Sequence, residues 1–495
     1  MLTAALLVLV LLAVGLWKGW HARPRVDKAL PGPRAFPLIG DIPHLFHADL
    51  PLHFLKLAQR YGPIYRLRFG RKDVVVLNSS DLIREALIRK WSDFAGRPHS
   101  FVADLISLGG KDLSLGNYSP TWRLQRKMAH TALQRSLRGD LEPTVQDKAQ
   151  CLCKVLHGHG GKPVDVAHIF SLHTSWVIST LVFGPLDLSV VEKMHDCMID
   201  LVESWNAFSV QILDVLPFLK VFPNPSLQRL LCLIKRRDTL IQSQMKKCQE
   251  TQQPAEARTL ADRMLHFARE HEAGKPGDAA LTQEHVHMAI VDLLIGGTET
   301  TAALLTWVVA FLLHHPRVEE QIHQELMAVV GLSRDPTYSD REQLPYLSAT
   351  ILETLRLRPS APLALPHTAT RDTSLSGFSI PRGTTVIPNL YGAHHDQSKW
   401  QQPLEFRPER FLEGSASAKA QRHLVPFSCG VRICLGEAVA RMESFLFLAH
   451  ILRDFQILPS TPGCLPDLQE HFGFLVQCKP FTVRLVPRLV ANPAE

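Results

Sequence analysis

The hydrophobic pattern divides the chain into a short apolar start and a long, mainly helical body. Residues Leu2 to Trp17 are almost entirely apolar. With Trp20 included, the run reaches about 20 residues, enough to span a bilayer. Helical periodicity dominates residues 140 to 280, and a long apolar helix is predicted from His285 to His314. Further helices are predicted at 347–358 and 437–452.

Short runs rich in branched and aromatic residues predict a few strands among these helices. The strands are expected at Ile64–Phe69, Val74–Leu77, Phe455–Leu458 and Phe481–Leu485. Tyr61-Gly62-Pro63 is the turn before the first of them. The pattern therefore predicts a mainly α protein with small β-sheets, of the α+β class.

The apolar start is predicted to be an uncleaved membrane anchor. No basic segment precedes it and no small-residue cleavage site follows it, which disfavours a cleaved signal peptide. Lys18, Arg23 and Arg25 follow it and would hold the rest of the chain in the cytosol. The expected division is an anchor at 1–20, a basic and proline-rich hinge at 21–40, and one large domain at 41–495. The sequons at Asn78 and Asn117 should then remain unglycosylated.

Composition narrows the class of partners. The formal net charge of +7 is mild for 495 residues and gives no nucleic-acid signature. The positive net charge is more consistent with a basic surface that binds an acidic protein partner. The nine cysteines are an odd number with little paired spacing, which indicates a reducing compartment.

The stretch Phe427–Gly436 carries the clearest chemistry. Cys434 lies between Gly430 and Gly436, with Arg432 and Phe427 before it. An isolated cysteine is usually a small buried apolar residue, but five spaced features together favour a metal-bound thiolate. Glycines let the backbone approach a flat ligand, and an arginine can pair with a carboxylate on it. A porphyrin with two propionates meets all of these requirements.

A second cluster lies inside the long apolar helix, at Gly296-Gly297-Thr298-Glu299-Thr300-Thr301. Two glycines destabilise a helix interior. The Thr300 hydroxyl can bond the carbonyl of Gly296, four residues back, and bend the helix. The resulting groove suits a diatomic ligand over iron, with Glu299 and Thr300 passing protons to it. The alternative is a kinked core helix with a solvated glutamate.

Two polar pairs at helical spacing are weaker signals. Trp122 and Arg126 share a helix face, so an indole N–H and a guanidinium can both bond a propionate. A surface stack of the two is the commoner explanation. Glu353 and Arg356, three apart, form an ion pair of a commonplace kind.

These motifs resemble those of the cytochrome P-450 superfamily. Its signature F-x-x-G-x-R-x-C-x-G is matched at every fixed position of 427–436, and its [AG]-G-x-[DE]-T-[TS] motif is matched at 296–301. The resemblance implies a single triangular fold and haem b with Cys434 as the axial metal ligand. It also implies that Glu353 and Arg356 are joined by Arg410 from Pro408-Glu409-Arg410-Phe411, in a structural role, and that His367 reaches a propionate.

Within the superfamily the chain looks most similar to steroid 21-hydroxylases. This similarity is clearest in the segments Gly62–Leu67, Asp93–Pro98, Asp292–Thr301 and Leu363–His367. The resemblance implies hydroxylation of progesterone and 17-hydroxyprogesterone at the 21-methyl, in steroid hormone synthesis. Arg126, in place of an expected lysine, should be neutral, whereas Ser360-Ala361 replaces a more branched pair and widens the pocket.

A steroid is a rigid apolar slab with few polar groups, so its pocket needs apolar walls and one or two donors. The candidates are Trp205 and Phe208 as walls, Arg237 as donor to a 3-keto oxygen, and Asp292 near the groove. Arg237 lies in Lys235-Arg236-Arg237-Asp238, where a solvated basic face is an equal alternative.

The chain shows no nucleotide site of its own, because His157–Lys162 fits neither phosphate-binding pattern. Electrons from NADPH are therefore expected through a flavoprotein reductase. The implied location is the endoplasmic reticulum membrane, with the catalytic domain facing the cytosol. The apolar patch Val215–Pro223 either dips into lipid or forms a core loop. The rival functions are a steroid 17-hydroxylase, a haem-thiolate isomerase and a non-catalytic haem or steroid binder.

Overall fold

The structure is a computed structural model that describes residues 30–36, 39–70, 72–251, 259–271, 279–412 and 414–488. The anchor predicted at 1–20 and most of the hinge predicted at 21–40 lie outside the described residues. The end of the hinge is described, and it lies along the first strand, where Arg66 N donates to Pro31 O at 2.8 Å.

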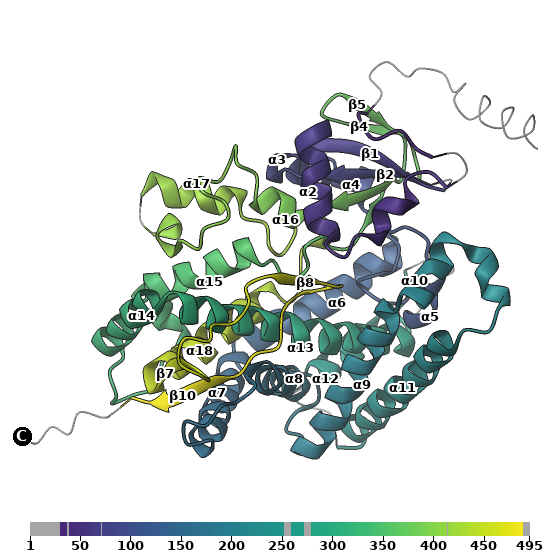
Figure 1. Cartoon of the computed structure of the whole chain (residues 1–495). Helices are drawn as coiled ribbons and strands as arrows, with labels where there is room; N and C mark the ends of the chain where they lie inside the picture. The colour runs from purple at the N-terminus through teal and green to yellow at the C-terminus, as the bar shows by residue number, and fades with distance from the viewer. Residues whose placement is uncertain are drawn as a thin grey trace, which may run out of the picture.

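The helical body is built around α13, the predicted long helix, which spans Gln283–His314 and runs through the middle of the molecule (Figure 1). α8 packs along α13, and α7, α15 and α18 complete the main core around them. The helices of this body are α6 (Pro120–Leu137), α7 (Leu141–Gly158), α8 (Val166–Phe183), α9 (Leu188–Asn206), α11 (Pro225–Thr251), α12 (Leu260–Glu270), α14 (Pro316–Val329), α15 (Pro345–Leu357) and α18 (Glu437–Asp454).

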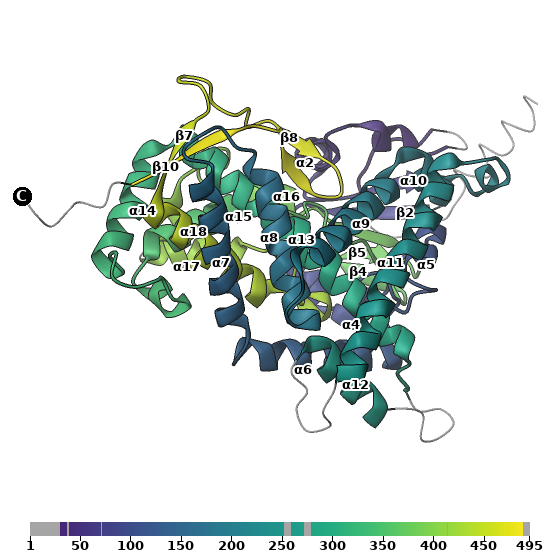
Figure 2. The same ribbon diagram turned by 90° about the horizontal axis from the view of Figure 1, so that it is seen from below.

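Both α8 and α13 are long and apolar enough to cross a membrane by composition alone. In the fold, 67% of the most apolar 18-residue stretch of α8 and 61% of that of α13 are buried. Packing inside the protein therefore accounts for their hydrophobicity. Viewed from below, α8, α9, α11 and α12 gather beside α13 (Figure 2). The central helix is thus covered by helices that lie far apart in the sequence.

A smaller β-rich region lies at the top of Figure 1. Its four-stranded sheet has the order β1-β2-β6-β3, with β1 and β2 antiparallel from Ile64↔Leu77 and β2 parallel to β6. The strands are β1 (Ile64–Phe69), β2 (Lys72–Leu77), β3 (His367–Thr368) and β6 (Thr385–Pro388). α2 (Leu50–Tyr61) packs on this sheet through Phe54, which joins a small core with Tyr65.

Three two-stranded sheets and several short helices complete the fold. The strand pairs are β7 (Phe455–Pro459) with β10 (Val483–Pro487), β4 (Thr373–Leu375) with β5 (Phe378–Ile380), and β8 (Glu470–Phe472) with β9 (Val476–Cys478). The short helices are η1 (Ile42–Phe46), α3 (Ser80–Arg84), η2 (Glu85–Arg89), α4 (Trp91–Phe94), α5 (Phe101–Ile106), α10 (Phe208–Val215), η3 (Pro217–Val221), η4 (Tyr338–Glu342), α16 (Leu390–His394), η5 (Pro408–Phe411), α17 (Ser415–His423) and η6 (Gly430–Arg432).

The sequence pattern predicted the main elements to within two residues at most ends. The helices predicted at 285–314, 347–358 and 437–452 and the strand at 64–69 are confirmed. The last strand begins two residues later than predicted, at Val483. For Val215–Pro223 the core-loop alternative is wrong, because Phe218, Val221 and Phe222 are 63%, 86% and 63% exposed.

Candidate functional site

Cys434 ends a tight turn just before α18. Its backbone N–H donates to Phe427 O at 3.0 Å. Gly430 has φ +78°, and a Cβ there would stand 1.8 Å from Leu87 O, so this position requires glycine. The turn therefore depends on the glycine of the motif as well as on its cysteine.

The Cys434 sulfur lies in a recess that the surrounding protein desolvates, although the residue itself is solvent-accessible. Burial raises the pKa of this thiol, while the backbone N–H groups of Gly436 and Glu437 and the charge of Arg126 lower it. These amides belong to the start of α18 and act in favour of the thiolate. Binding a metal ion would drive the remaining deprotonation.

Three arginines cluster near the turn that carries Cys434. Arg432 donates to Ala95 O at 2.7 Å and to Gly116 O at 2.8 Å. Arg97 donates to Leu365 O at 3.0 Å and Pro366 O at 2.8 Å. Arg126 donates to Ile433 O, beside the cysteine. Their hydrogen bonds thus go mostly to neutral backbone carbonyls.

Burial lowers the pKa of all three guanidinium groups, and mutual repulsion adds to this for Arg97 and Arg432. Among the described residues that bear on Arg97 and Arg432, Asp112 is the carboxylate that opposes this repulsion. Three cations and one carboxylate leave an excess of buried positive charge, which is costly unless an anion neutralises it. Two propionates would supply that anion and accept charge-assisted hydrogen bonds, so these residues fit a haem.

Trp122 and His367 lie in the same cluster. The Trp122 indole N–H donates to Leu113 O at 3.0 Å, and the Arg432 guanidinium lies 4.1 Å from the ring centroid. In this structure Trp122 therefore supports Arg432 by a cation–π contact. His367 is buried, with Nδ1 2.8 Å from Phe94 O, and burial beside Arg97 lowers its pKa well below the usual value. Because a carbonyl only accepts, Nδ1 carries the proton and Nε2 is the nitrogen left for a ligand, whose negative charge would favour protonation of the ring.

On the opposite side, α13 carries the predicted acid and alcohol. The Thr300 hydroxyl donates to Gly296 O at 2.5 Å, which confirms the predicted bond. A Cβ at Gly296 would meet nothing within 4 Å, whereas one at Gly297 would press on Ile178 of α8 at 3.0 Å. Gly296 therefore opens space beside the helix, and Gly297 allows α8 to pack closely.

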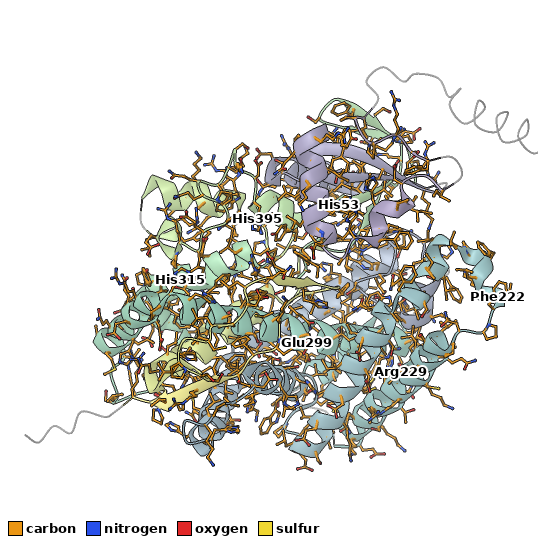
Figure 3. All side chains as sticks on the ribbon, viewed as in Figure 1. His53, Phe222, Arg229, Glu299, His315 and His395 are labelled. Atoms are coloured by element: carbon orange, nitrogen blue, oxygen red, sulfur yellow. The ribbon has the colours of Figure 1, made fainter. Side chains whose placement is uncertain are left out.

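Glu299 lies near the middle of the molecule (Figure 3). Its carboxylate accepts a hydrogen bond from Ser171, whose oxygen also lies 2.7 Å from His195 Nε2. The other ring nitrogen of His195 is 3.1 Å from the exposed carboxylate of Asp196. A continuous chain of polar groups thus joins Glu299 to the protein surface.

Asp292, one turn before Gly296, holds the loop at 112–116. Its two carboxylate oxygens accept from Leu113 N at 2.6 Å and from the Ser114 hydroxyl at 2.7 Å. Burial and the neighbouring Asp112 raise its pKa to about 8. Because carbonyls of this same loop accept from Arg97, Trp122 and Arg432, Asp292 connects α13 to the arginine cluster.

Arg237 of α11 is fully buried, so the solvated-face alternative is wrong. It donates to Ile106 O at 2.9 Å and to Asp238 at 2.8 Å, and His287 Nε2 also lies 2.8 Å from Asp238. Its Nη2 is buried and makes an ion pair with Asp238 without a well-aligned hydrogen bond. This atom is a donor available to a ligand oxygen.

The side chains of the two predicted apolar walls have different surroundings. Trp205 packs against Phe474 and joins an apolar cluster that includes Ile106 and Ile295 of α13. Phe208 is 61% exposed and lies against Phe46, so the structure does not bring it into the interior with Arg237. Phe208 was predicted to line the pocket because it is aromatic. Aromatic character does not show whether a residue lies on the inner or the outer face of a helix.

Glu353 and Arg356 of α15 come together with Arg410 of η5. Glu353 and Arg356 are fully buried and form a two-point ion pair at 2.8 and 2.9 Å. Arg410 Nε donates to the same carboxylate at 3.0 Å. Arg356 also donates to His394 O and Pro403 O, which fixes the chain between α16 and η5.

Sequence reasoning did not assign Arg97, Ser171 or His195. Arg97 lies in the segment Asp93–Pro98, which had been noted for its resemblance, so that segment held a usable signal. Ser171 and His195 belong to α8 and α9, and their approach to Glu299 depends on helix packing. No local pattern could have revealed it.

Comparison with known proteins agrees with this geometry. The family model described as Cytochrome P450 matches residues 30–485. Steroid 21-hydroxylase from Bos taurus is 45% identical over 497 residues, covering 99% of this chain and 97% of the relative. The Homo sapiens steroid 21-hydroxylase is 44% identical over 499 residues, covering 99% and 98%. A zebra fish cytochrome P450 structure with progesterone has a TM-score of 0.81 at 34% identity, covering 89% of this chain and 100% of that one.

The match spans the turn that carries Cys434, the arginine cluster and the central helix α13, at identities far above those of fold likeness alone. The chain belongs to the cytochrome P450 family.

Proposed function

We propose that this protein is a steroid 21-monooxygenase, which hydroxylates progesterone and 17-hydroxyprogesterone at the 21-methyl using O₂ and electrons that originate from NADPH. The observation that carries the proposal is near-complete alignment, at about 45% identity, with relatives named steroid 21-hydroxylase. The site adds support, because it joins a cysteine recess fit for haem to a buried arginine among apolar side chains.

The family's cofactor is a haem with a cysteine thiolate ligand, and when bound it activates O₂ for insertion of one oxygen atom into a C–H bond. In this chain Cys434 would hold the iron, and Arg97, Arg126, Arg432 and His367 would hold the propionates. The ion network of Glu353 would keep the segment beneath the haem in place. In this assignment, each of the three arginines near Cys434 is paired with a propionate.

The steroid would lie between α13 and the cluster of α5, α9, α10 and α11. The buried side chains of that cluster are Val102, Ile106, Leu201, Val210, Leu230, Leu233 and Ile234. Trp205 and Ile295 pack against them and suit the apolar slab. Arg237 would donate to the 3-keto oxygen, which fixes one end of the steroid and so directs the other end toward the reacting position.

Protons would reach the site through Glu299 and Thr300. The polar chain from Asp196 through His195 and Ser171 supplies Glu299 from the surface without a path through the apolar substrate region. Thr300 would then orient the proton at the position where oxygen binds, beside the open space at Gly296.

The protein would act at the endoplasmic reticulum membrane, facing the cytosol. Exposed Phe46, Phe208, Phe218, Val221 and Phe222 are suited to contact lipid together with the predicted anchor. Electrons would come from an NADPH-dependent flavoprotein reductase, for which exposed Arg123 and Lys127 on α6 offer positive charge. On a domain that faces the cytosol, Asn78 and Asn117 would remain unglycosylated.

The test is product analysis after membranes containing the protein are incubated with reductase, NADPH and progesterone. The proposal predicts 21-hydroxyprogesterone that forms only when reductase is present. A product hydroxylated at position 17 would show instead that the protein is a steroid 17-hydroxylase. Turnover without reductase would indicate an isomerase, and tight steroid binding without product would indicate a binding protein.

A further inference from the structure

Three histidines gather at the start of the catalytic domain, remote in sequence from the haem motifs. His44 belongs to η1, His47 follows that helix, and His53 lies in the first turns of α2. Their spacing, H-x₂-H-x₅-H, brings one nitrogen of each ring within 4.8 Å of the others. His53 is labelled in Figure 3, on the β-rich part of the molecule.

The rings contact one another directly. His44 Nδ1 lies 2.7 Å from His53 Nε2, and the His47 and His53 ring centroids are 3.6 Å apart with planes at 14°. One ring nitrogen of each of the three residues therefore lies close enough to the others to share a bound ion. Imidazole nitrogen is the commonest side-chain ligand of metal ions.

We propose that His44, His47 and His53 bind a divalent transition-metal ion of the zinc class. Imidazole nitrogens suit zinc, copper and nickel, whereas calcium and magnesium take oxygen ligands. A tetrahedral ion with bonds of about 2.0–2.1 Å needs ligand nitrogens roughly 3.4 Å apart. The exposed His47 side chain can turn by a rotamer change and close the remaining gap.

Asp41 stands behind this cluster. Its Oδ2 accepts from Arg68 N at 2.8 Å, while Oδ1 is buried without a hydrogen-bond partner. The backbone carbonyl of Asp41 accepts from His44 N at 3.0 Å. Asp41 therefore helps to fix the backbone that carries His44.

A metal ion here would join η1 to α2. Phe46 of the same η1 helix contacts Phe208 of α10, with ring centroids 5.7 Å apart. The ion would thus hold the apolar surface proposed for lipid contact in a fixed orientation to the β-rich region. The proposed metal site itself depends only on the three histidines, so it stands apart from the proposed steroid chemistry.

The test uses the haem-loaded full chain, purified without a polyhistidine tag and stripped of metal with a chelator. Equilibrium dialysis against Zn²⁺ measures bound zinc per chain in the wild type, in His44→Gln, in His53→Gln, and in the triple variant that adds His47→Gln. His471→Gln, which changes an exposed histidine of β8, is the matched control. The optical spectrum of the haem verifies that each variant is folded.

The expected result is one zinc more per chain in the wild type and His471→Gln than in the triple variant, with each single variant binding more weakly. Co²⁺ in place of Zn²⁺ should give the absorption of a nitrogen-ligated tetrahedral ion, lost in the triple variant. Equal zinc in the wild type and the triple variant would overturn the proposal. Undiminished binding by His44→Gln would overturn the three-ligand site as well.

Discussion

The two sides of the proposed site differ in how their arginines are neutralised. On the cysteine side, Arg97, Arg126 and Arg432 donate mainly to backbone carbonyls and keep an excess of positive charge. On the steroid side, Arg237 is paired with Asp238, which also contacts His287. The first arrangement is suited to a ligand with two carboxylates, and the second to a neutral ligand with one polar oxygen. Each side is thus matched to a different charge.

The largest effect should come from removing a cation on the cysteine side. We expect Arg126→Leu to lose most of its bound haem, because a buried propionate would lose a charge-assisted partner. Arg123→Leu, three residues earlier on α6 and exposed, is the matched control and should keep its haem. Haem per chain is measured by absorbance after purification. Equal haem in both variants would show that the positive excess is not used by the cofactor.

On the steroid side the expected effect is on affinity. Arg237→Met should weaken progesterone binding by about 10- to 100-fold, the loss of roughly 1.5–3 kcal/mol for a hydrogen bond from a charged donor. Haem content should stay unchanged. The exposed neighbour Arg236→Met is the control. Spectral titration with progesterone gives both dissociation constants, and matching values would remove Arg237 from the substrate site.

A smaller effect is expected where the two sides meet, at α13. Thr300→Ala should lower the hydroxysteroid formed per NADPH severalfold and raise peroxide, because the oriented hydroxyl is lost. Thr300→Ser keeps a hydroxyl and should stay close to the wild type. Product and peroxide are quantified against NADPH consumed. Unchanged coupling in the alanine variant would separate Thr300 from proton delivery.

Asp292 gives a pH dependence of stability. Its folded pKa of about 8 lies above the ordinary value of 3.8, so between these pH values the folded state holds a proton that the unfolded state has released. Its contribution to stability is therefore lost as the pH rises toward 8, with a slope of at most about 1.4 kcal/mol per pH unit. Asp292→Asn should flatten this slope. Denaturant unfolding between pH 5 and 8 measures it, and identical slopes would refute the raised pKa.

The cysteine side was the more predictable of the two from sequence. Its turn lies within ten consecutive residues, so spacing alone places Cys434, Gly430 and Arg432 together. The bond from Thr300 to Gly296 was predictable for the same reason, since i and i+4 are neighbours on any helix. The long helix followed from its long apolar pattern, and the first two strands followed from their branched and aromatic residues.

The steroid side is assembled from α5, α9, α11 and α13, and sequence reasoning placed its residues less well. Arg237 and Arg236 are adjacent and chemically alike, yet one is fully buried and the other exposed. Which face of α11 turns inward depends on packing against α5 and α9. Phe208 was misplaced for this reason, and Ser171 and His195 were missed for it.

The central claim is that Cys434 supplies a thiolate to the haem iron, and the reduced carbon monoxide complex tests it most directly. Thiolate ligation gives this complex a strongly red-shifted Soret band. The wild type should show that band, and Cys434→Ser should lose it, while Cys429→Ser, a buried cysteine of the same turn, should keep it. A red-shifted band that persists in Cys434→Ser would contradict the account.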